Sequence, residues 1–211
     1  IREWTPDGRG LLVGIGRDFS WMRESRASRL ALIDATERKA ENVLFDDYGT
    51  DGAISPDGKR VLFVREGSEA WWRQGYKGSR AGQIWLFNRD DGSFTQVIAE
   101  ETESRWPLWK ADGKGFYFVS NRGGTYNLWE HNFGAKKDKQ LTPFKGDSVV
   151  FPAISRDGGT VVFRVKFDLY RWHPGDKEAA KIEIEAGGDS VAPGTERVVL
   201  DKATSISFTS D

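Results

Sequence analysis

Short apolar stretches recur along the chain, and each of them follows a turn that contains Asp-Gly. The stretches are rich in β-branched and aromatic residues, which is typical of buried strands. They lie at Leu11–Val13, Val61–Val64, Phe116–Val119 and Val161–Phe163. Two more strand-like stretches follow each of them before the next turn. The pattern predicts an all-β chain built from short antiparallel strands.

A turn of nearly constant composition sets the register of a repeat. In its most complete form, Ile54-Ser55-Pro56-Asp57-Gly58, proline fixes φ, aspartate bonds its own backbone and glycine tolerates positive φ, so the chain reverses tightly. The same frame recurs at residues 4–8, 109–113 and 154–158, and residues 208–211 begin it again. Four antiparallel strands in about 50 residues, repeated in this way, are typical of one blade of a β-propeller.

We expect an all-β β-propeller of four-stranded antiparallel blades, with the turn between the first and second strands of each blade. Four nearly complete blades are predicted at residues 1–47, 48–101, 102–145 and 146–200, and the start of a further blade at 201–211. Both chain ends fall inside a repeat, which predicts a fragment of a propeller that has six or seven blades in the parent. A two-sheet sandwich also has short strands and turns, but it does not repeat one turn in one register.

The remaining strands of each blade follow from the same register. Third strands are expected at Arg29–Ile33, Gln83–Phe87, Tyr126–Trp129 and Asp168–Trp172, and closing strands at Asn42–Phe45, Thr95–Ile98, Lys139–Thr142 and Lys181–Ile184. Over residues 23–38 a helix is the alternative, because helix propensity is favourable there. We predict that Trp85, Trp129 and Trp172 occupy equivalent third-strand positions, where large rings fill the space between blades.

Charge and composition narrow the range of partners. The 31 basic and 32 acidic residues nearly cancel, which argues against a nucleic-acid partner or a polybasic membrane surface. No apolar run approaches the roughly 20 residues that span a bilayer, so no membrane partner is expected. Cysteine is absent, which excludes disulfides and thiolate chemistry but leaves the compartment open. A basic-aromatic surface for single-stranded nucleic acid remains a minor alternative.

The sequence offers no catalytic, cofactor or metal motif. The two histidines, His131 and His173, are predicted to lie in surface loops. We therefore do not expect either of them to act as the general base of a hydrolase. No Gly-x-Ser-x-Gly, phosphate-binding loop or EF-hand spacing occurs. The carboxylate pairs at 46–47 and 90–91 are interpreted as turns between strands. The repeated Asp7, Asp57, Asp112 and Asp157 are likewise interpreted as turn residues, not as a ring of ligands.

A long insertion in the second repeat is the best candidate for binding. It runs from Glu66 to Gly82, and loops of this length are usually functional or disordered. Tryptophan, tyrosine and arginine dominate binding hot spots, and cations can bind a peptide carboxylate. The insertion supplies Trp71, Trp72, Arg73, Tyr76, Lys77 and Arg80. The alternative is that these aromatic side chains only cover a blade edge.

The first repeat carries a similar insertion, at residues 17–23, which contains Trp21 and Arg23. Both insertions lie between the second and third strands of their blades. Because equivalent loops of neighbouring blades emerge on the same face, we predict a composite surface for a peptide or protein segment.

The repeat resembles that of two known propeller families, the TolB-like propellers and the propeller modules of tricorn-type serine proteases. The resemblance covers essentially the whole chain and is carried by Ser55–Phe63, by Ser120–Gly124 followed by Asn127-Leu128-Trp129, and by Lys139–Thr142. The stretch Trp72–Ser79 favours the tricorn type. Ala111 and Arg156 depart from the pattern, since they replace the proline of the turn.

Each resemblance implies a different biological role. The tricorn type implies a cytoplasmic propeller that filters or guides peptides, with a serine nucleophile in separate C-terminal domains. The TolB type implies a periplasmic platform for docking proteins. A third possibility is an intramolecular scaffold that only holds the rest of the parent chain. Neither family places catalytic residues on the repeat, so the resemblance carries none over to this chain, and its oligomeric state stays open.

Overall fold

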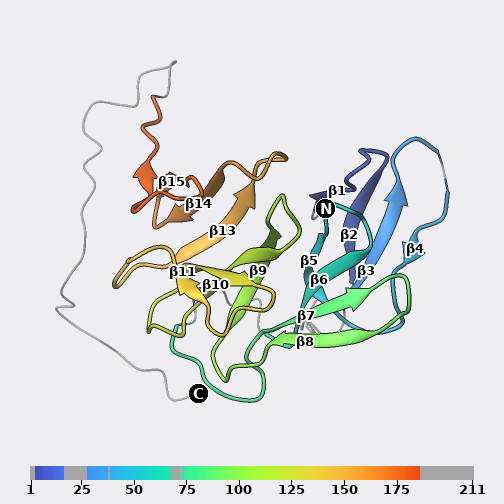
Figure 1. Cartoon of the computed structure of the whole chain (residues 1–211), viewed down its shortest axis with the longest axis horizontal. Helices are drawn as coiled ribbons and strands as arrows, with labels where there is room; N and C mark the ends of the chain where they lie inside the picture. The colour runs from blue at the N-terminus through green and yellow to red at the C-terminus, as the bar shows by residue number, and fades with distance from the viewer. Residues whose placement is uncertain (1–2, 17–27, 38, 68–71, 73, 186–211) are drawn as a thin grey trace, which may run out of the picture.

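The computed structural model places the backbone in four antiparallel sheets of four strands each (Figure 1). It describes residues 3–16, 28–37, 39–67, 72 and 74–185. No helix within this part of the chain is long and apolar enough to cross a membrane. The fold class predicted from the repeat, four four-stranded antiparallel blades in a propeller arrangement, is confirmed.

Each sheet is formed by four strands that are consecutive in the sequence. Blade 1 contains β1 (Glu3–Trp4), β2 (Gly10–Gly16), β3 (Ser28–Asp34) and β4 (Asn42–Val43), and blade 2 contains β5 (Thr50–Ile54), β6 (Arg60–Arg65), β7 (Gln83–Asn88) and β8 (Phe94–Ile98). Blade 3 contains β9 (Ser104–Trp109), β10 (Gly115–Ser120), β11 (Asn127–Asn132) and β12 (Lys139–Gln140). Blade 4 contains β13 (Val149–Ile154), β14 (Val161–Val165), β15 (Asp168–Trp172) and β16 (Ala180–Lys181).

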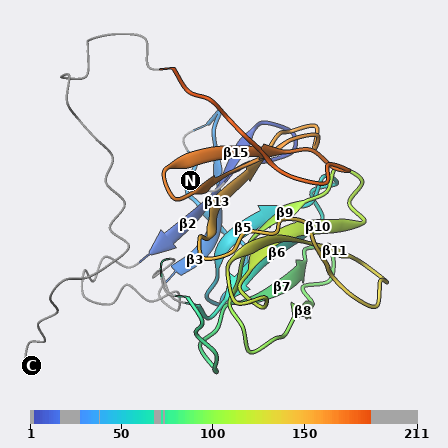
Figure 2. The ribbon, with the colours of Figure 1, turned by 90° about the vertical axis from the view of Figure 1, so that its left-hand side faces the viewer.

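The blades fan out with β5, β9 and β13 innermost, as Figures 1 and 2 show. Alternate side chains of a strand bury on opposite faces of its sheet. Thus Val61 and Phe63 of β6 belong to the core between blades 1 and 2, whereas Leu62 and Val64 belong to the core between blades 2 and 3. A third core joins blades 3 and 4 around Phe163. Burial on both faces explains why the second strands are continuous apolar runs.

The Asp-Gly turns form as the sequence predicts. In blade 2 the hydroxyl of Ser55 and the backbone N–H of Lys59 both donate to Asp57. The serine hydroxyl is the main reason that the pKa of Asp57 lies below its ordinary value. Gly58 has a φ of 74°, and the other three turn glycines lie between 64° and 72°. These aspartates are therefore turn residues, as expected.

The strand prediction holds where the helix was the alternative. Residues 28–34 form β3, which pairs with β2 along its whole length, so a helix over that stretch is wrong. Residues 35–37 of that alternative are not helical either, and its remaining residues, 23–27 and 38, lie outside the described part of the chain. So do residues 186–211, where the end of the fourth repeat and the start of a further blade were predicted.

Trp172 does not occupy the position predicted for it. Trp85 is opposite Phe63, and Trp129 is opposite Phe118, whereas Trp172 is opposite Val161. The residue of blade 4 that matches the first two is Tyr170, which is opposite Phe163. Trp172 instead lies two residues further along β15, is 2% exposed, and packs edge-on against Tyr117 of blade 3. The sequence interpretation missed this because both positions are aromatic.

His131 is also misplaced by the sequence interpretation. It lies within β11, its side chain is 16% exposed, and its Nδ1 is 2.7 Å from a carboxylate oxygen of Asp138. The ring packs against Phe116 and Phe133. Arg122 donates to the other oxygen of Asp138 at 2.7 Å. His131 is thus part of a structural network on blade 3, while His173 lies just after β15 and is half exposed, as predicted.

Candidate functional site

The insertion of blade 2 emerges where the inner strands begin. Thr50, at the start of β5, pairs with Val64, near the end of β6, so the connection from β6 to β7 leaves from this end of the blade. The Asp-Gly turns lie at the opposite end, after the inner strands. We call these two ends the loop end and the turn end.

Two glycines close the neck of the insertion. The backbone N–H of Gly67 donates to the carbonyl of Arg80 at 2.9 Å, and the N–H of Gly82 donates to the carboxylate of Glu103 at 2.9 Å. A Cβ at Gly67 would lie 3.0 Å from that carboxylate, and one at Gly82 would lie 3.0 Å from the Ser104 carbonyl. Gly67 also has a φ of 81°. Both positions therefore require glycine.

The start of the insertion is clamped to the junction of blades 1 and 2. The Tyr48 hydroxyl donates to the Glu66 carboxylate at 2.5 Å. The guanidinium of Arg65 lies 4.7 Å from the Tyr48 ring centroid and 5.2 Å from that of Trp85, and it pairs with Asp47 at 3.2 Å. Such stacked and paired groups fix the direction in which the chain leaves the blade.

Further along, the insertion lies against blade 3 and reaches blade 4. Lys77 pairs with Thr102 as an isolated antiparallel bridge, and Gly78 N–H donates to the carbonyl of Glu101 at 3.2 Å. The side-chain amide of Gln74 donates to the Ser148 hydroxyl, 2.8 Å away, just before β13. In Figure 1 this teal segment runs from blade 2 toward the side of the molecule where blades 3 and 4 lie. The insertion therefore spans three blades at the loop end.

The structure places only part of the predicted binding set. Trp72 is 67% exposed, Lys77 and Arg80 are exposed, and Tyr76 is partly buried beside Gly78. These four residues share the insertion at the loop end. Trp71, Arg73, Trp21 and Arg23 lie outside the described residues, so the composite surface with blade 1 stays a prediction.

A row of strained inner-strand residues at the loop end was not predicted. Asp51, Trp106 and Phe151 occupy the same position in β5, β9 and β13, and their φ values are 48°, 50° and 53°. Each sits at a β-bulge, where the pairing register shifts. Non-glycine residues with positive φ often mark functional positions. The sequence signal is the next residue, which is a glycine in β5 and a proline in β9 and β13.

Two of these bulge residues form an aromatic pair with cations beside it. The rings of Trp106 and Phe151 are 5.4 Å apart, and Phe151 is 46% exposed. Arg105 lies over Trp106 at 4.8 Å, and Arg164 lies over Phe151 at 4.9 Å. Aromatic faces flanked by guanidinium groups suit apolar side chains and carboxylates.

Acidic residues hold Arg105 in place at the junction of blades 2 and 3. Its Nε is 3.6 Å from Asp51 and 3.9 Å from Glu103, and both carboxylates are almost completely buried. Glu103 therefore contacts both the neck glycine Gly82 and the inner strand β9. Through these contacts Glu103 connects the neck of the insertion to Arg105, which lies over Trp106 of the aromatic pair. In the part of the chain that the structure describes, no group of three acidic or histidine side chains is placed to hold a metal ion.

The four antiparallel blades define the class of protein as a β-propeller. Residues 1–178 match the family model described as the tricorn protease N-terminal β-propeller domain. The chain belongs to this family. It is 28% identical to the "Tricorn protease homolog 1" of Streptomyces coelicolor over 194 residues, which is 90% of this chain and 17% of that protein. The chain thus spans about a sixth of the curated relative's length, within the propeller region.

Solved structures agree on the fold. TolB from Acinetobacter baumannii superposes with a TM-score of 0.61 at 23% identity, covering 84% of this chain and 41% of that one. The tricorn protease crystal structure superposes with a TM-score of 0.54 at 16% identity, covering 88% of this chain and 23% of that one. At these identities the likeness concerns the fold alone.

Proposed function

We propose that this propeller is a non-catalytic module that binds extended peptide segments at its loop end and guides them within a serine-peptidase parent. One observation carries the proposal: the insertion is anchored at its neck and reaches from blade 2 to Ser148 before blade 4, while Trp72 stays 67% exposed. Packing alone does not require so exposed an indole. The family membership, in which the relatives carry the name tricorn protease, supports a peptide as the partner.

The charges on the insertion favour acidic peptides. Lys77 and Arg80 are exposed, and Trp72 offers a large exposed ring on the same insertion. A carboxylate on the peptide would pair with the cations while an apolar side chain packs on the indole. An extended peptide would then pass over Trp106 and Phe151 near the inner strands.

Binding of an N-acetylated acidic peptide, free of lysine and arginine, tests the proposal through tryptophan fluorescence. We expect Trp72→Ala to weaken binding about tenfold or more, in the range of a hot-spot residue, with an unchanged melting temperature. Trp4→Ala is the matched control, because Trp4 is 60% exposed at the turn end and should not affect this peptide. If Trp72→Ala lowers stability instead of affinity, the aromatic residues of the insertion serve packing and the proposal fails.

The docking alternative predicts a different result. A platform for folded proteins would bind a folded partner through the whole loop end and would ignore short acetylated peptides. The double variant Lys77→Ala, Arg80→Ala should bind the acidic peptide more weakly than wild type. Unchanged affinity for the peptide would contradict a role of these two cations in guiding it.

A further inference from the structure

A cavity of about 780 Å³ lies at the turn end, remote from the proposed peptide surface. Its walls include the last inner-strand residue of every blade: Trp4, Ile54, Trp109 and Ile154. The turns that follow supply most of the remaining walls, among them Pro6, Pro56 and Ala111. The cavity is thus a largely apolar chamber shared by four blades.

Glu3 breaks the apolar pattern of this chamber. It pairs with Leu12 in the register that places Ala53, Leu108 and Ala153 at the same position of the other three blades. A carboxylate costs free energy to bury, whereas the aliphatic residues at the equivalent positions do not. Glu3 is therefore a specific feature of blade 1 and not a requirement of the repeat.

The carboxylate of Glu3 has a structural contact and spare capacity. One oxygen accepts the backbone N–H of Ile54, on the inner edge of β5. Among the described residues the structure gives this carboxylate no ion pair, although it can accept several hydrogen bonds. Burial raises the pKa of Glu3 to about 7, which shows how poorly the site solvates the negative charge.

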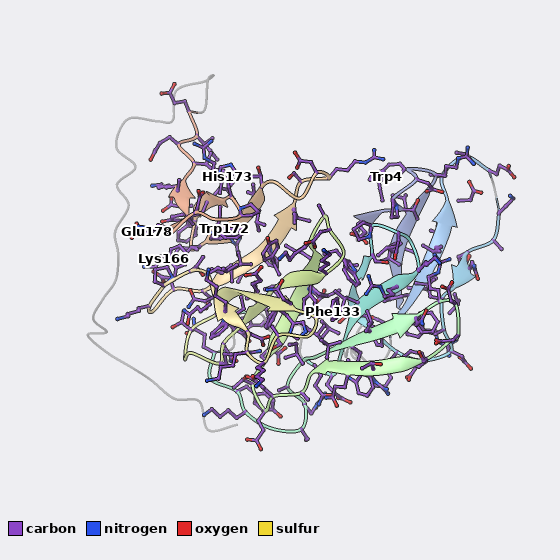
Figure 3. All side chains as sticks on the ribbon, viewed as in Figure 1. Trp4, Phe133, Lys166, Trp172, His173 and Glu178 are labelled. Carbon is purple, nitrogen blue, oxygen red and sulfur yellow. The ribbon has the colours of Figure 1, made fainter. Side chains whose placement is uncertain are left out.

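The surroundings of Glu3 match an organic cation whose charged group is attached to an apolar chain, here called the stem. Trp4 and Trp109 both line the chamber. The Trp109 ring is 6% exposed and already carries the Arg60 guanidinium at 4.8 Å, so the exposed ring of Trp4 is the aromatic face that can attract an ammonium or guanidinium group. Trp4, the last residue of β1, is 60% exposed and is labelled in the upper right part of Figure 3. Ile54 and Ile154 would contact the stem.

One other charge lines the cavity. Arg156 is exposed and donates to the carbonyl of Pro6 at 3.1 Å, which joins the turns of blades 4 and 1. It replaces the turn proline found in blades 1 and 2. Its positive charge opposes a cationic ligand, so Glu3 has to supply the selectivity for the cation.

We infer that the turn-end cavity is a binding site for an organic cation, such as a lysine side chain or the free amino terminus of a peptide, which pairs with Glu3 beside the exposed ring of Trp4. This site is separate from the loop-end surface. It does not depend on the proposed function.

Three small probes test the inference by calorimetric titration. Nα-acetyl-lysine amide carries a side-chain ammonium, alanyl-alanine amide carries an amino-terminal ammonium, and Nα-acetyl-norleucine amide is neutral. At pH 8 we expect one or both cations to bind at least about tenfold more tightly than the norleucine derivative, as a charge-assisted contact allows. The stronger of the two identifies the source of the cation. Equal affinities for all three probes would overturn the inference.

The pH dependence isolates the role of Glu3. A cation binds the ionised carboxylate, so affinity for Nα-acetyl-lysine amide, whose ammonium stays charged over this range, should fall about tenfold from pH 8 to pH 6 for a group of pKa about 7. Glu3→Gln keeps an acceptor for Ile54 N–H and removes the charge. It should abolish both the preference for cations and the pH dependence, while the norleucine derivative binds as before. Unchanged cation binding in Glu3→Gln would contradict the inference.

Two further variants keep the test decisive if Glu3→Gln does not fold. Trp4→Ala should weaken binding of the cationic probes without affecting the acidic peptide at the loop end. Arg156→Gln should strengthen binding of the cations, since it removes the opposing charge. Weaker binding in Arg156→Gln, or no effect of Trp4→Ala, would show that these probes bind elsewhere. The loop-end peptide is acetylated and acidic, so it offers no cation to Glu3. A negative result at one site therefore does not affect the conclusion about the other site.

Discussion

The indole nitrogen of Trp109 donates a hydrogen bond to the backbone carbonyl of Ala53, 2.9 Å away. It joins the inner strand of blade 3 to that of blade 2. Glu3 of blade 1 accepts the N–H of the same peptide unit, from Ile54, which points in the opposite direction to the Ala53 carbonyl. Side chains of both neighbouring blades thus contact one peptide unit of β5, the inner strand of blade 2.

Trp109→Phe should destabilise the domain while keeping a ring in the core. The variant removes the hydrogen bond between the two blades, and a hydrogen bond of this kind contributes about 0.5 to 1.5 kcal/mol to the free energy of unfolding. Urea denaturation measures the change. Trp85→Phe is the control, because Trp85 donates within its own blade to Gln83 at 3.3 Å and is only partly buried. Equal effects of the two variants would contradict a role in joining blades.

The turn glycines offer a matched pair that separates backbone strain from packing. Gly58 has a φ of 74° and open space where a Cβ would lie, so Gly58→Ala should cost about 1 to 2 kcal/mol through strain alone. Gly158 has a φ of 71°, but a Cβ there would lie 2.8 Å from the Cβ of Ala111 in blade 3. Gly158→Ala should therefore destabilise more, by a further amount of about 1 to 3 kcal/mol.

Thermal unfolding of the rescue variant checks this explanation. Adding Ala111→Gly to Gly158→Ala removes the overlapping methyl group and should recover part of the lost stability. If the double variant is no more stable than Gly158→Ala, close contact between the turns of blades 3 and 4 does not explain the cost.

Glu103 should control the order of the insertion. Glu103→Ala removes the acceptor of Gly82 N–H at a position that is 4% exposed, so we expect a loss of about 1 to 3 kcal/mol and faster amide exchange at Gly82 and Gly67. Glu101→Ala changes an exposed side chain of the same connection and serves as the control. Unchanged exchange at Gly82 in Glu103→Ala would mean that the neck is held by other contacts.

Asp138 should make the stability of blade 3 depend on pH. Burial alone would raise the pKa of Asp138, but hydrogen bonds from His131 and Arg122 hold it below the ordinary value. A carboxyl whose pKa is lowered on folding contributes stability above its unfolded pKa of about 3.9 and loses it as the pH falls through the folded pKa. Asp138→Asn should therefore cost about 1 to 3 kcal/mol at pH 7 and progressively less in acid.

Chemical denaturation of wild type and Asp138→Asn between pH 7 and pH 3 measures this difference. Asp147→Asn is the control, since Asp147 pairs with Lys166 at the surface and such pairs contribute little. A stability difference that stays constant over the whole range would rule out the ionised Asp138 as its source.

The sequence predicted those features of the fold that depend on local chemistry. The Asp-Gly turn specifies its own geometry, and the apolar second strands β6 and β10 are buried on both faces because blades 2 and 3 each pack between two others. The sequence interpretation misplaced Trp172 because Tyr170, two residues away on the same strand, is also aromatic, and only the pairing register distinguishes the two positions. His131 was misplaced because its partners, Asp138 and Phe116, come from neighbouring strands and loops.

Only part of the candidate site could be predicted from the sequence. The length and composition of residues 66–82 identified the insertion, but its contact with Ser148 depends on how three blades sit around the axis. A proline follows each of the strained residues Trp106 and Phe151, but their positive φ could not be predicted because it depends on bulges formed by pairing with the second strands. Likewise, Glu3 acquires its environment only when four inner strands meet.

Hydrogen exchange of the 211-residue chain, with and without the N-acetylated acidic peptide, tests the central claim most directly. Binding at the loop end predicts slower exchange at residues 74–82 and 104–106, with no change at the turn end around residues 154–158. Protection confined to the turn end, or no protection at any amide under conditions where the peptide is bound, would contradict the account.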